Sequence, residues 1–309
     1  MMNTKISKAG LSREQWLDLR HTGVGGSDVG AIMGFNPWAG ILDIYLDKLN
    51  KLPQNEENEY MYWGNILEDI VAKEFSKRTG KKVRNSNFMF RSEEYPWMVA
   101  DVDRIVIGEN AGLECKTTNA YGKRQWDGEE IPPSYILQCQ HYMAVMGFEK
   151  MYIAVLIGGN QFTWKEIQRD EELISIIIEK EKDFWLNFVQ KGIPPAADKA
   201  SKKALEIMYP IDSGGVINLD DEDENQLRIL SQLMESKSAI EGQITELQTR
   251  IKQKMKDSSY ALGAEYKVSY KSSTRNVVDS KKLKEKYPEV YSNVCKASTT
   301  RRFLLKEVK

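Results

Sequence analysis

The 309-residue sequence has few of the residues on which several protein classes depend. Its three cysteines, Cys115, Cys139 and Cys295, are odd in number, widely spaced and without a C-x-x-C pair, so neither a disulfide framework nor a zinc ribbon is supported. The two histidines, His21 and His141, are too few for a zinc site built from several imidazoles. A catalytic site in this chain is therefore expected to use carboxylates, lysines or hydroxyls.

Long hydrophobic runs are also missing. No apolar stretch approaches the roughly 20 residues that a membrane-spanning helix needs, and the mean hydropathy is −0.52. The first ten residues contain lysines but no apolar stretch of the kind found in secretory signals. We therefore expect a cytoplasmic protein with no membrane partner.

The chain has no excess charge of either sign, because 44 basic residues stand against 45 acidic ones. The simplest electrostatic argument for a polyanionic partner is thereby removed. The charges are unevenly distributed, however: residues 212–235 hold seven acidic and one basic residue, whereas residues 264–309 hold twelve basic and five acidic ones. A nucleic-acid partner would have to be bound by localised positive charge.

The hydrophobic pattern alternates between helical and strand periods over the first two thirds of the chain. Expected helices cover residues 11–20, 27–32, 41–49, 63–79, 133–146 and 171–190, with Ser12 and Ser27-Asp28 as N-caps and Gly80 after the fourth. Expected strands cover residues 83–90, 98–107, 112–117, 151–157 and 162–167. This order predicts an α/β core with a mixed sheet.

The pattern changes after Pro195. Residues 223–256 place apolar side chains three or four apart, which predicts a long amphipathic helix of coiled-coil character whose apolar face serves packing or oligomerisation. Short strands are expected at 266–270 and 301–305, around a helix at 281–287. We therefore divide the chain into residues 1–197 and a C-terminal α+β appendage, 198–309, whose role stays open.

One constellation of charged residues predicts chemistry. Asp103 ends one predicted strand, and the next strand carries Glu114 and Lys116 on the same face, because side chains alternate along a strand. Carboxylate oxygens, with the main-chain carbonyl of Cys115 as a further ligand, suit Mg²⁺ or Mn²⁺, and a lysine beside a metal-bound water suits phosphodiester hydrolysis.

Other interpretations of these residues stay open at this point. Glu-x-Lys on a strand is also typical of a solvated ion pair. Asp101 competes with Asp103, since both would face the same side of the predicted strand. Glu68 lies on a largely apolar helix, where it would need a partner or a metal if buried, or it lies on an exposed face beside Asp69.

The sequence resembles the YqaJ-type viral recombinases, which are exonucleases similar to phage lambda exonuclease within the PD-(D/E)xK nuclease superfamily. The resemblance runs from about Trp16 to Pro195. It rests on Trp16 to Arg20, Gly25-Gly26-Ser27-Asp28, Asn36-Pro37-Trp38, Trp63-Gly64 leading to Glu68, Asp103, Glu114-Cys115-Lys116, and Tyr135-Ile136-Leu137-Gln138 with Gln140. Val102 stands where the superfamily signature has proline.

The resemblance implies a restriction-endonuclease-like core, a mixed central sheet flanked by helices. It implies Asp103 and Glu114 as ligands of two Mg²⁺ or Mn²⁺ ions and Lys116 as the residue that positions water. The remaining implied site residues are Glu68 as a supporting acid, Tyr135 and Gln138 as lining residues, and Arg20 and Ser27 as ligands of a DNA 5′-phosphate.

The activity implied is a Mg²⁺-dependent 5′-to-3′ exonuclease on linear double-stranded DNA, supplying 3′ tails to a single-strand annealing protein of a phage recombination system in the host cytoplasm. A homo-oligomer, in the form of a ring-shaped trimer, is implied as well. Two alternatives remain: an endonuclease of the same superfamily, structure-specific or sequence-specific, and a non-catalytic DNA-binding scaffold that acts through the long helix and the basic tail.

Overall fold

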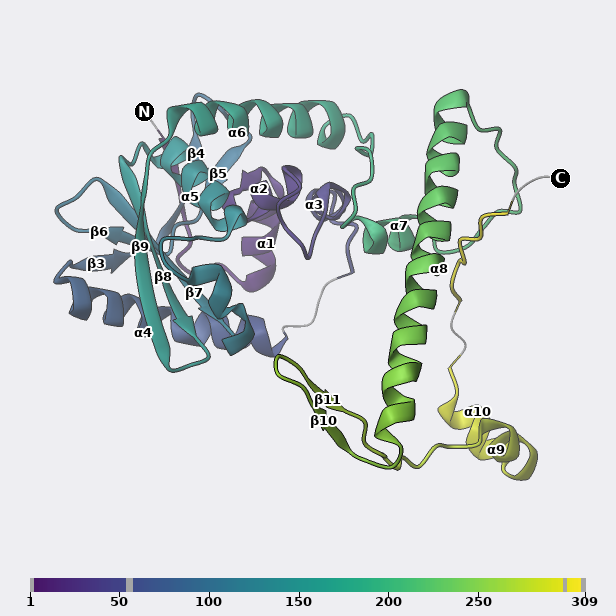
Figure 1. Ribbon diagram of the computed structural model, residues 1–309. Coiled ribbons are helices and arrows are strands. Elements are labelled where there is room, and N and C mark those ends of the chain that lie inside the picture. Colours follow the sequence, from purple (N-terminus) through teal and green to yellow (C-terminus); the bar gives the residue numbers. More distant parts are fainter. Residues whose placement is uncertain (1–2, 54–57, 297–298, 307–309) are drawn as a thin grey trace. The chain divides into compact units, whose positions relative to one another are not determined.

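The computed structural model describes residues 3–53, 58–296 and 299–306. The chain forms two compact units, Met1–Tyr209 and Pro210–Lys309 (Figure 1). The first unit extends past the boundary expected after residue 197, because helix α7 (Lys202–Met208) buries Ala204 with Leu42 and Tyr45. None of the helices in the described residues is apolar over a length that would span a membrane.

The helices of the first unit confirm most of the sequence pattern. They are α1 (Arg13–His21), α2 (Gly26–Ile32), α3 (Ile41–Lys48), α4 (Glu59–Thr79), α5 (Pro133–Met146), α6 (Glu171–Asp183), continued by a π-helical turn (Phe184–Val189), and α7. Ser12 caps α1, and Gly80, at φ 73°, ends α4 as expected. The expected cap of α2 was wrong: Gly25 is the N-cap, and the Asp28 side chain reaches back to its N–H.

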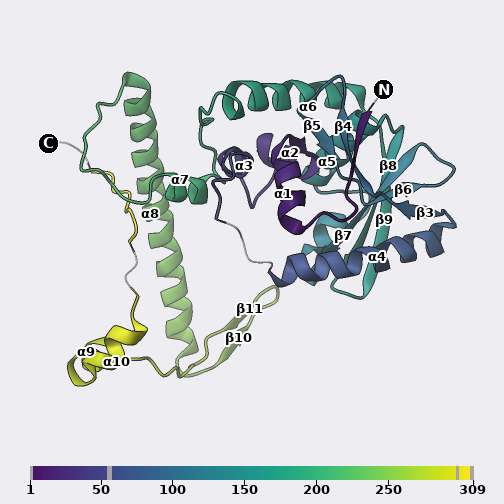
Figure 2. The ribbon, with the colours of Figure 1, turned by 180° about the vertical axis from the view of Figure 1, so that it is seen from behind.

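A five-stranded mixed sheet forms the centre of this unit. Its order is β3 (Val83–Asn85), β6 (Arg104–Val106), β7 (Ala111–Thr118), β8 (Lys150–Ile157) and β9 (Gln161–Gln168), with only the β7–β8 pair parallel. Along β8, Tyr152 and Ala154 pack with α4, whereas Ile153 and Val155 pack with α5. The sheet therefore has a helix on each face, and Figure 2 shows α4 along one of them.

A second sheet explains where the strand predictions failed. It has the order β1 (Asn3–Ser7), β4 (Phe88–Ser92), β5 (Met98–Ala100) and β2 (Val24–Gly25). The predicted strands 83–90 and 98–107 were wrong as continuous elements, because each is divided between the two sheets. The second break falls at Asp101-Val102-Asp103, where the chain crosses from one sheet to the other with Val102 fully buried.

The predicted common strand face of Asp101 and Asp103 was therefore also wrong. Residues 101–103 have no strand conformation, so the alternation of side chains that the prediction assumed does not hold there. The two carboxylates are bound by different partners, as described below.

The second unit contains α8 (Asp221–Met255), the hairpin β10 (Tyr260–Leu262) and β11 (Lys267–Ser269), α9 (Ser280–Lys286) and α10 (Pro288–Val294). The long helix, the strand near 266–270 and the helix near 281–287 are confirmed. The strand expected at 301–305 was wrong, since these described residues have no strand partner. Alternating side chains alone do not supply the partner that a strand needs.

Candidate active site

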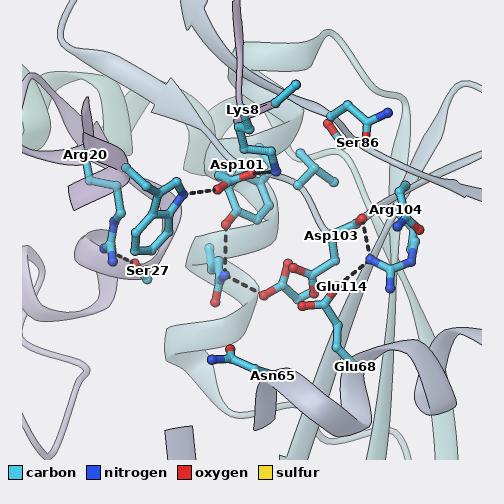
Figure 3. Close-up of a pocket in the computed structure, with 17 residues that line it drawn as sticks. Lys8, Arg20, Ser27, Asn65, Glu68, Ser86, Asp101, Asp103, Arg104 and Glu114 are labelled. Carbon is cyan, nitrogen blue, oxygen red and sulfur yellow. Dashed lines mark hydrogen bonds and ion pairs between the residues drawn. The ribbon is translucent and has the colours of Figure 1, made fainter. Parts of the chain in front are cut away.

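A cavity of about 560 Å³ opens where the two sheets meet (Figure 3). Helices α1, α2, α4 and α5, strand β7 and the connection 101–103 all contribute to its wall. Seven of the residues singled out from the sequence line it together: Arg20, Ser27, Glu68, Asp101, Asp103, Glu114 and Gln138. Residues distant in the sequence thus share one polar cavity.

The pairing of β6 with β7 brings Asp103 to Glu114. Arg104 pairs with Leu113 in antiparallel register, so the residue before Arg104 lies opposite the residue after Leu113. The Asp103 carboxylate accepts a hydrogen bond from the N–H of Cys115 at 2.8 Å. Figure 3 shows Asp103, Glu114 and Glu68 pointing toward one another, so the cavity wall here carries converging negative charge.

Glu114 is only 3% exposed, and its two oxygens differ. Oε1 accepts hydrogen bonds from the Gln138 amide and the Lys116 ammonium, both at 2.7 Å. Oε2 is buried and has no hydrogen-bond partner in the described part of the chain. A buried carboxylate oxygen without a donor is costly, which makes this atom a candidate ligand of a cation.

The pKa values reflect crowding of negative charge. Burial and repulsion from Glu114 raise the pKa of Asp103 well above its usual value, and burial likewise raises the pKa of Glu114. Burial works to lower the pKa of Lys116, but the carboxylates of Glu114 and Asp103 outweigh it and raise that pKa. Without a bound cation, Lys116 is therefore an ammonium, and its single charge does not neutralise the carboxylates of Asp103 and Glu114.

A chain of contacts fixes the Lys116 side chain. Its Nζ lies 4.9 Å from the centre of the Tyr135 ring, and Tyr135 stacks on Trp126 at 5.7 Å between ring centres. The buried Lys165 of β9 donates to the carbonyl oxygens of Trp126, at 3.0 Å, and of Glu130. Tyr135 thus contacts the site through Lys116. Lys165 fixes the main chain at Trp126, on which Tyr135 stacks.

Arg104 is a site residue that the sequence interpretation missed. Its guanidinium binds the carboxylates of Glu68 and Asp69 and donates to the main-chain oxygen of Asp103 at 2.8 Å. Glu68 lies in the cavity wall, and this contact ties helix α4 to the first residue of β6. No local signal distinguishes Arg104 from an ordinary exposed strand residue, because its partners come from a helix more than 30 positions earlier.

The other end of the cavity holds Arg20 and Ser27 together. Arg20 donates to Ser27 Oγ at 3.0 Å and to Asp28 at 3.3 Å. Asp28 is buried and also contacts Lys48 Nζ at 2.6 Å. Burial works to raise the pKa of Asp28, but the charges of Lys48 and Arg20 outweigh it and lower that pKa. Asp28 is therefore an ionised acid between two cations.

Asp101 belongs to this second end rather than to the acid pair. Its carboxylate accepts a hydrogen bond from Trp16 Nε1 at 2.9 Å and binds the ammonium of Lys8. The Trp16 ring in turn lies 5.1 Å from the guanidinium carbon of Arg20. Lys8 was missed because strand β1, which positions it, gave no recognisable sequence signal.

The residues present suit a hard cation at the Asp103 and Glu114 end. Among the described residues, no group of three or more His, Cys, Asp or Glu side chains is arranged as a metal site. Two carboxylates are nevertheless adjacent, their pKa values are raised, and Glu114 Oε2 lacks a donor. A cation completed by water or a main-chain oxygen would relieve all three conditions.

Comparison with known proteins gives a consistent result along the sequence. Residues 15–149 match the YqaJ-like viral recombinase domain. The chain is 43% identical over 304 residues to the uncharacterized protein YqaJ of Bacillus subtilis (strain 168), which covers 96% of this chain and 95% of that protein.

Two solved structures are similar in fold. The structure of LHK-Exo in complex with dAMP is 22% identical in sequence and has a TM-score of 0.50. The match covers 63% of this chain and 99% of the LHK-Exo chain. A structure of the alkaline exonuclease LHK-Exo from Laribacter hongkongensis is 21% identical, with coverage of 58% and 94% and a TM-score of 0.49. The first of these shows a shared mixed α/β fold, as the sequence predicted.

Proposed function

Because the chain belongs to the YqaJ-like viral recombinase family, we propose that it is a divalent-metal-dependent exonuclease. Its substrate is linear double-stranded DNA, which it degrades from the 5′ end to leave 3′ single-stranded tails. The observation that supports this most directly is the unpartnered, buried Oε2 of Glu114, beside Asp103 and Lys116 in the same cavity as Arg20. A relative of the same fold has been crystallised with dAMP, a deoxynucleoside monophosphate.

Asp103 and Glu114 would hold Mg²⁺ or Mn²⁺, as two ions, with the main-chain carbonyl of Cys115 as a further ligand. When bound, such ions screen the anionic phosphodiester, generate a hydroxide-like nucleophile from water and stabilise the leaving oxygen. Gln138 holds the Glu114 carboxylate by donating to Oε1, which leaves Oε2 without a donor. Arg104 holds Glu68 nearby as a supporting acid.

We assign Lys116 to positioning the attacking water and balancing charge. Its Nζ already donates to Glu114, and its remaining N–H groups can donate hydrogen bonds to the attacking water or to a phosphate oxygen. The contact with the Tyr135 ring limits where that ammonium can lie. Water is thereby presented to the phosphorus from a defined side.

Arg20 and Ser27 would bind the terminal 5′-phosphate. A guanidinium presents paired donors that match phosphate oxygens, and the Ser27 hydroxyl adds a third. Asp28 accepts from the Arg20 guanidinium at 3.3 Å, and Lys48 donates to the main-chain oxygen of Arg20 at 3.2 Å. A phosphate held at this end places the first phosphodiester toward the acids at the other.

The test is a time course on linear duplex with a single 5′-phosphate, in Mg²⁺ and in EDTA, with the product sizes resolved. We expect mononucleotides and a shrinking phosphorylated strand in Mg²⁺ only. Glu114→Gln should lower the rate roughly 10³-fold, the order seen when a charge-stabilising group is lost. Glu171→Gln, at a side chain that is 73% exposed, is the matched control and should leave the rate unchanged.

The same assay separates the alternatives. Cleavage of a covalently closed circle would identify an endonuclease, and metal-independent DNA binding without any product would identify a non-catalytic scaffold. If exonuclease products appear, their 3′ tails are the substrate of a single-strand annealing protein, which we propose as the partner. The predicted ring-shaped trimer is tested separately by the mass of the assembly on DNA.

A further inference from the structure

The long helix α8 carries a heptad seam of mainly aliphatic residues. Counting Leu230 as position a, the a and d positions of successive heptads are Leu230, Leu233, Lys237, Ile240, Ile244, Leu247 and Ile251. Six of the seven are branched aliphatic residues, and a repeat of this kind is the signature of a helix that winds around another helix. One lysine within the seam is the sort of polar residue that fixes how the partner is oriented.

Five of the six apolar seam residues are exposed to solvent, and Leu230 is half-buried. Leu233 and Leu247 are each 62% exposed, Ile240 is 56% exposed, and Ile244 and Ile251 are 48% and 41% exposed. Such a continuous apolar stripe along a 35-residue helix is unusual for a surface that stays in water.

The charges at the two ends of α8 identify a partner. Five consecutive acidic residues, 220–224, begin the helix, and Arg250, Lys252, Lys254 and Lys256 end it. Two copies of this helix side by side in the same direction would place acids on acids and bases on bases. In opposite directions, each acidic end lies on the basic end of the other copy.

We propose that α8 pairs with α8 of a second copy of this chain as an antiparallel coiled coil. In the register that matches both seam and charge, Leu230 packs against Leu247 of the partner subunit and Leu233 against Ile244 of the partner subunit. Asp223, at position a, then lies opposite Lys254 of the partner subunit, at position d. The two Lys237 side chains lie on either side of the centre, where their stems cover the seam and their ammonium groups reach water.

This pairing joins second units and is separate from any ring that the nuclease units form. Where each α8 pair joins two assemblies of first units, removing the α8 contact halves the mass. A wild-type assembly with an even number of chains is expected.

The first measurement is the mass of the full-length chain by light scattering, with and without Leu233→Glu plus Leu247→Glu. These changes place charges in the seam, and we expect a twofold lower mass. The control, Ser238→Glu plus Thr245→Glu, adds the same charge at two b positions, which lie outside the seam. It should leave the mass unchanged. Equal masses for wild type and seam variant, or a monomeric wild type, overturn the proposal, and an unchanged circular dichroism spectrum excludes unfolding.

The second measurement fixes direction by disulfide trapping in a Cys295→Ser background, since Cys295 is the exposed free cysteine among the described residues. Leu230→Cys plus Leu247→Cys should form covalent dimers. Either substitution alone should not, because 17 helical residues separate the two positions by about 25 Å. Dimers from Leu230→Cys alone would show a parallel pair, and no dimer from the double variant would show a different partner; both results overturn the proposal.

Discussion

The two ends of the active-site cavity handle buried charge in opposite ways. At one end Asp103, Glu114 and Glu68 lie with Lys116 and Arg104, and the pKa values of Asp103 and Glu114 are raised. At the other end Asp28 lies between Arg20 and Lys48, and the pKa of that acid is lowered. The proposed metal ion would relieve the first end, and the proposed DNA phosphate would meet Arg20 at the second, anion-accepting end.

The largest effect expected on stability comes from breaking the balanced end. Lys48→Met leaves Asp28 buried with only Arg20 as a charged partner, and loss of one partner of a buried pair costs about 3 kcal/mol. Urea unfolding should show this loss. The double variant Asp28→Asn plus Lys48→Met should recover part of it, and a double variant as unstable as Lys48→Met would contradict the role of charge.

At the acidic end, removing a buried carboxylate should stabilise the protein instead of destabilising it. The folded-state pKa of Asp103 is raised, so its ionisation opposes folding once the pH passes the unfolded value near 4, and the penalty is complete above the folded value. Asp103→Asn should therefore raise the melting temperature in EDTA at pH 8, by about 2–4 °C for each kcal/mol removed. Asp28→Asn, where the folded-state pKa is lowered, should reduce the melting temperature at that pH.

Magnesium should affect the stability of the wild type and of Asp103→Asn differently. Added Mg²⁺ should stabilise the wild type by mass action and should have little effect on Asp103→Asn. Binding should also weaken as the pH falls toward the raised pKa values, because protons compete with the ion. Equal Mg²⁺-induced shifts in both proteins, measured by thermal denaturation, would argue against a cation at this end.

Arg20→Lys tests the anion-accepting end with a smaller effect. Lysine keeps the charge but loses the paired donors, so we expect about a tenfold slower rate on 5′-phosphorylated ends. Rates on ends with a 5′-hydroxyl should hardly change. An equal loss on both substrates, in a comparison of initial rates, would remove the proposed phosphate contact.

The smallest change is expected from Lys165→Met. It frees the carbonyl oxygens of Trp126 and Glu130, so Tyr135 should hold Lys116 less firmly and kcat should fall a few-fold with KM little changed. Lys150→Met, at a half-buried lysine of the same sheet that binds surface carboxylates, is the control. A purely structural role would instead lower stability without altering the rate per folded molecule.

Sequence reasoning found the acids because their signal is local. Glu114 and Lys116 lie two residues apart on one strand, and the 2.7 Å contact between them follows from that spacing. Gln138 was found through resemblance alone, since nothing near it in sequence indicates that α5 faces β7. Gln140 was a mark of the same resemblance, yet its amide bridges the β9–α6 connection through Gln168 and Asp170.

What the sequence could not supply was the division of strands between sheets. Residues 98–107 have one apolar pattern, and only the pairing partners, β4 on one side and β7 on the other, decide that the strand breaks at Asp101. Arg104 and Lys8 depend on the same long-range pairings and were missed for that reason. The helix α8 was predicted well because its period repeats over many turns and needs no distant partner to be recognised.

The crossing at Asp101-Val102-Asp103 has a geometric consequence for the substrate. Asp101 contacts Trp16, which lies against the guanidinium of Arg20, and Asp103 faces Glu114. Two peptide bonds thus separate the residue that supports the proposed phosphate-binding end from the residue that faces Glu114. Val102 is fully enclosed between them, so the backbone itself sets the separation of the two carboxylates.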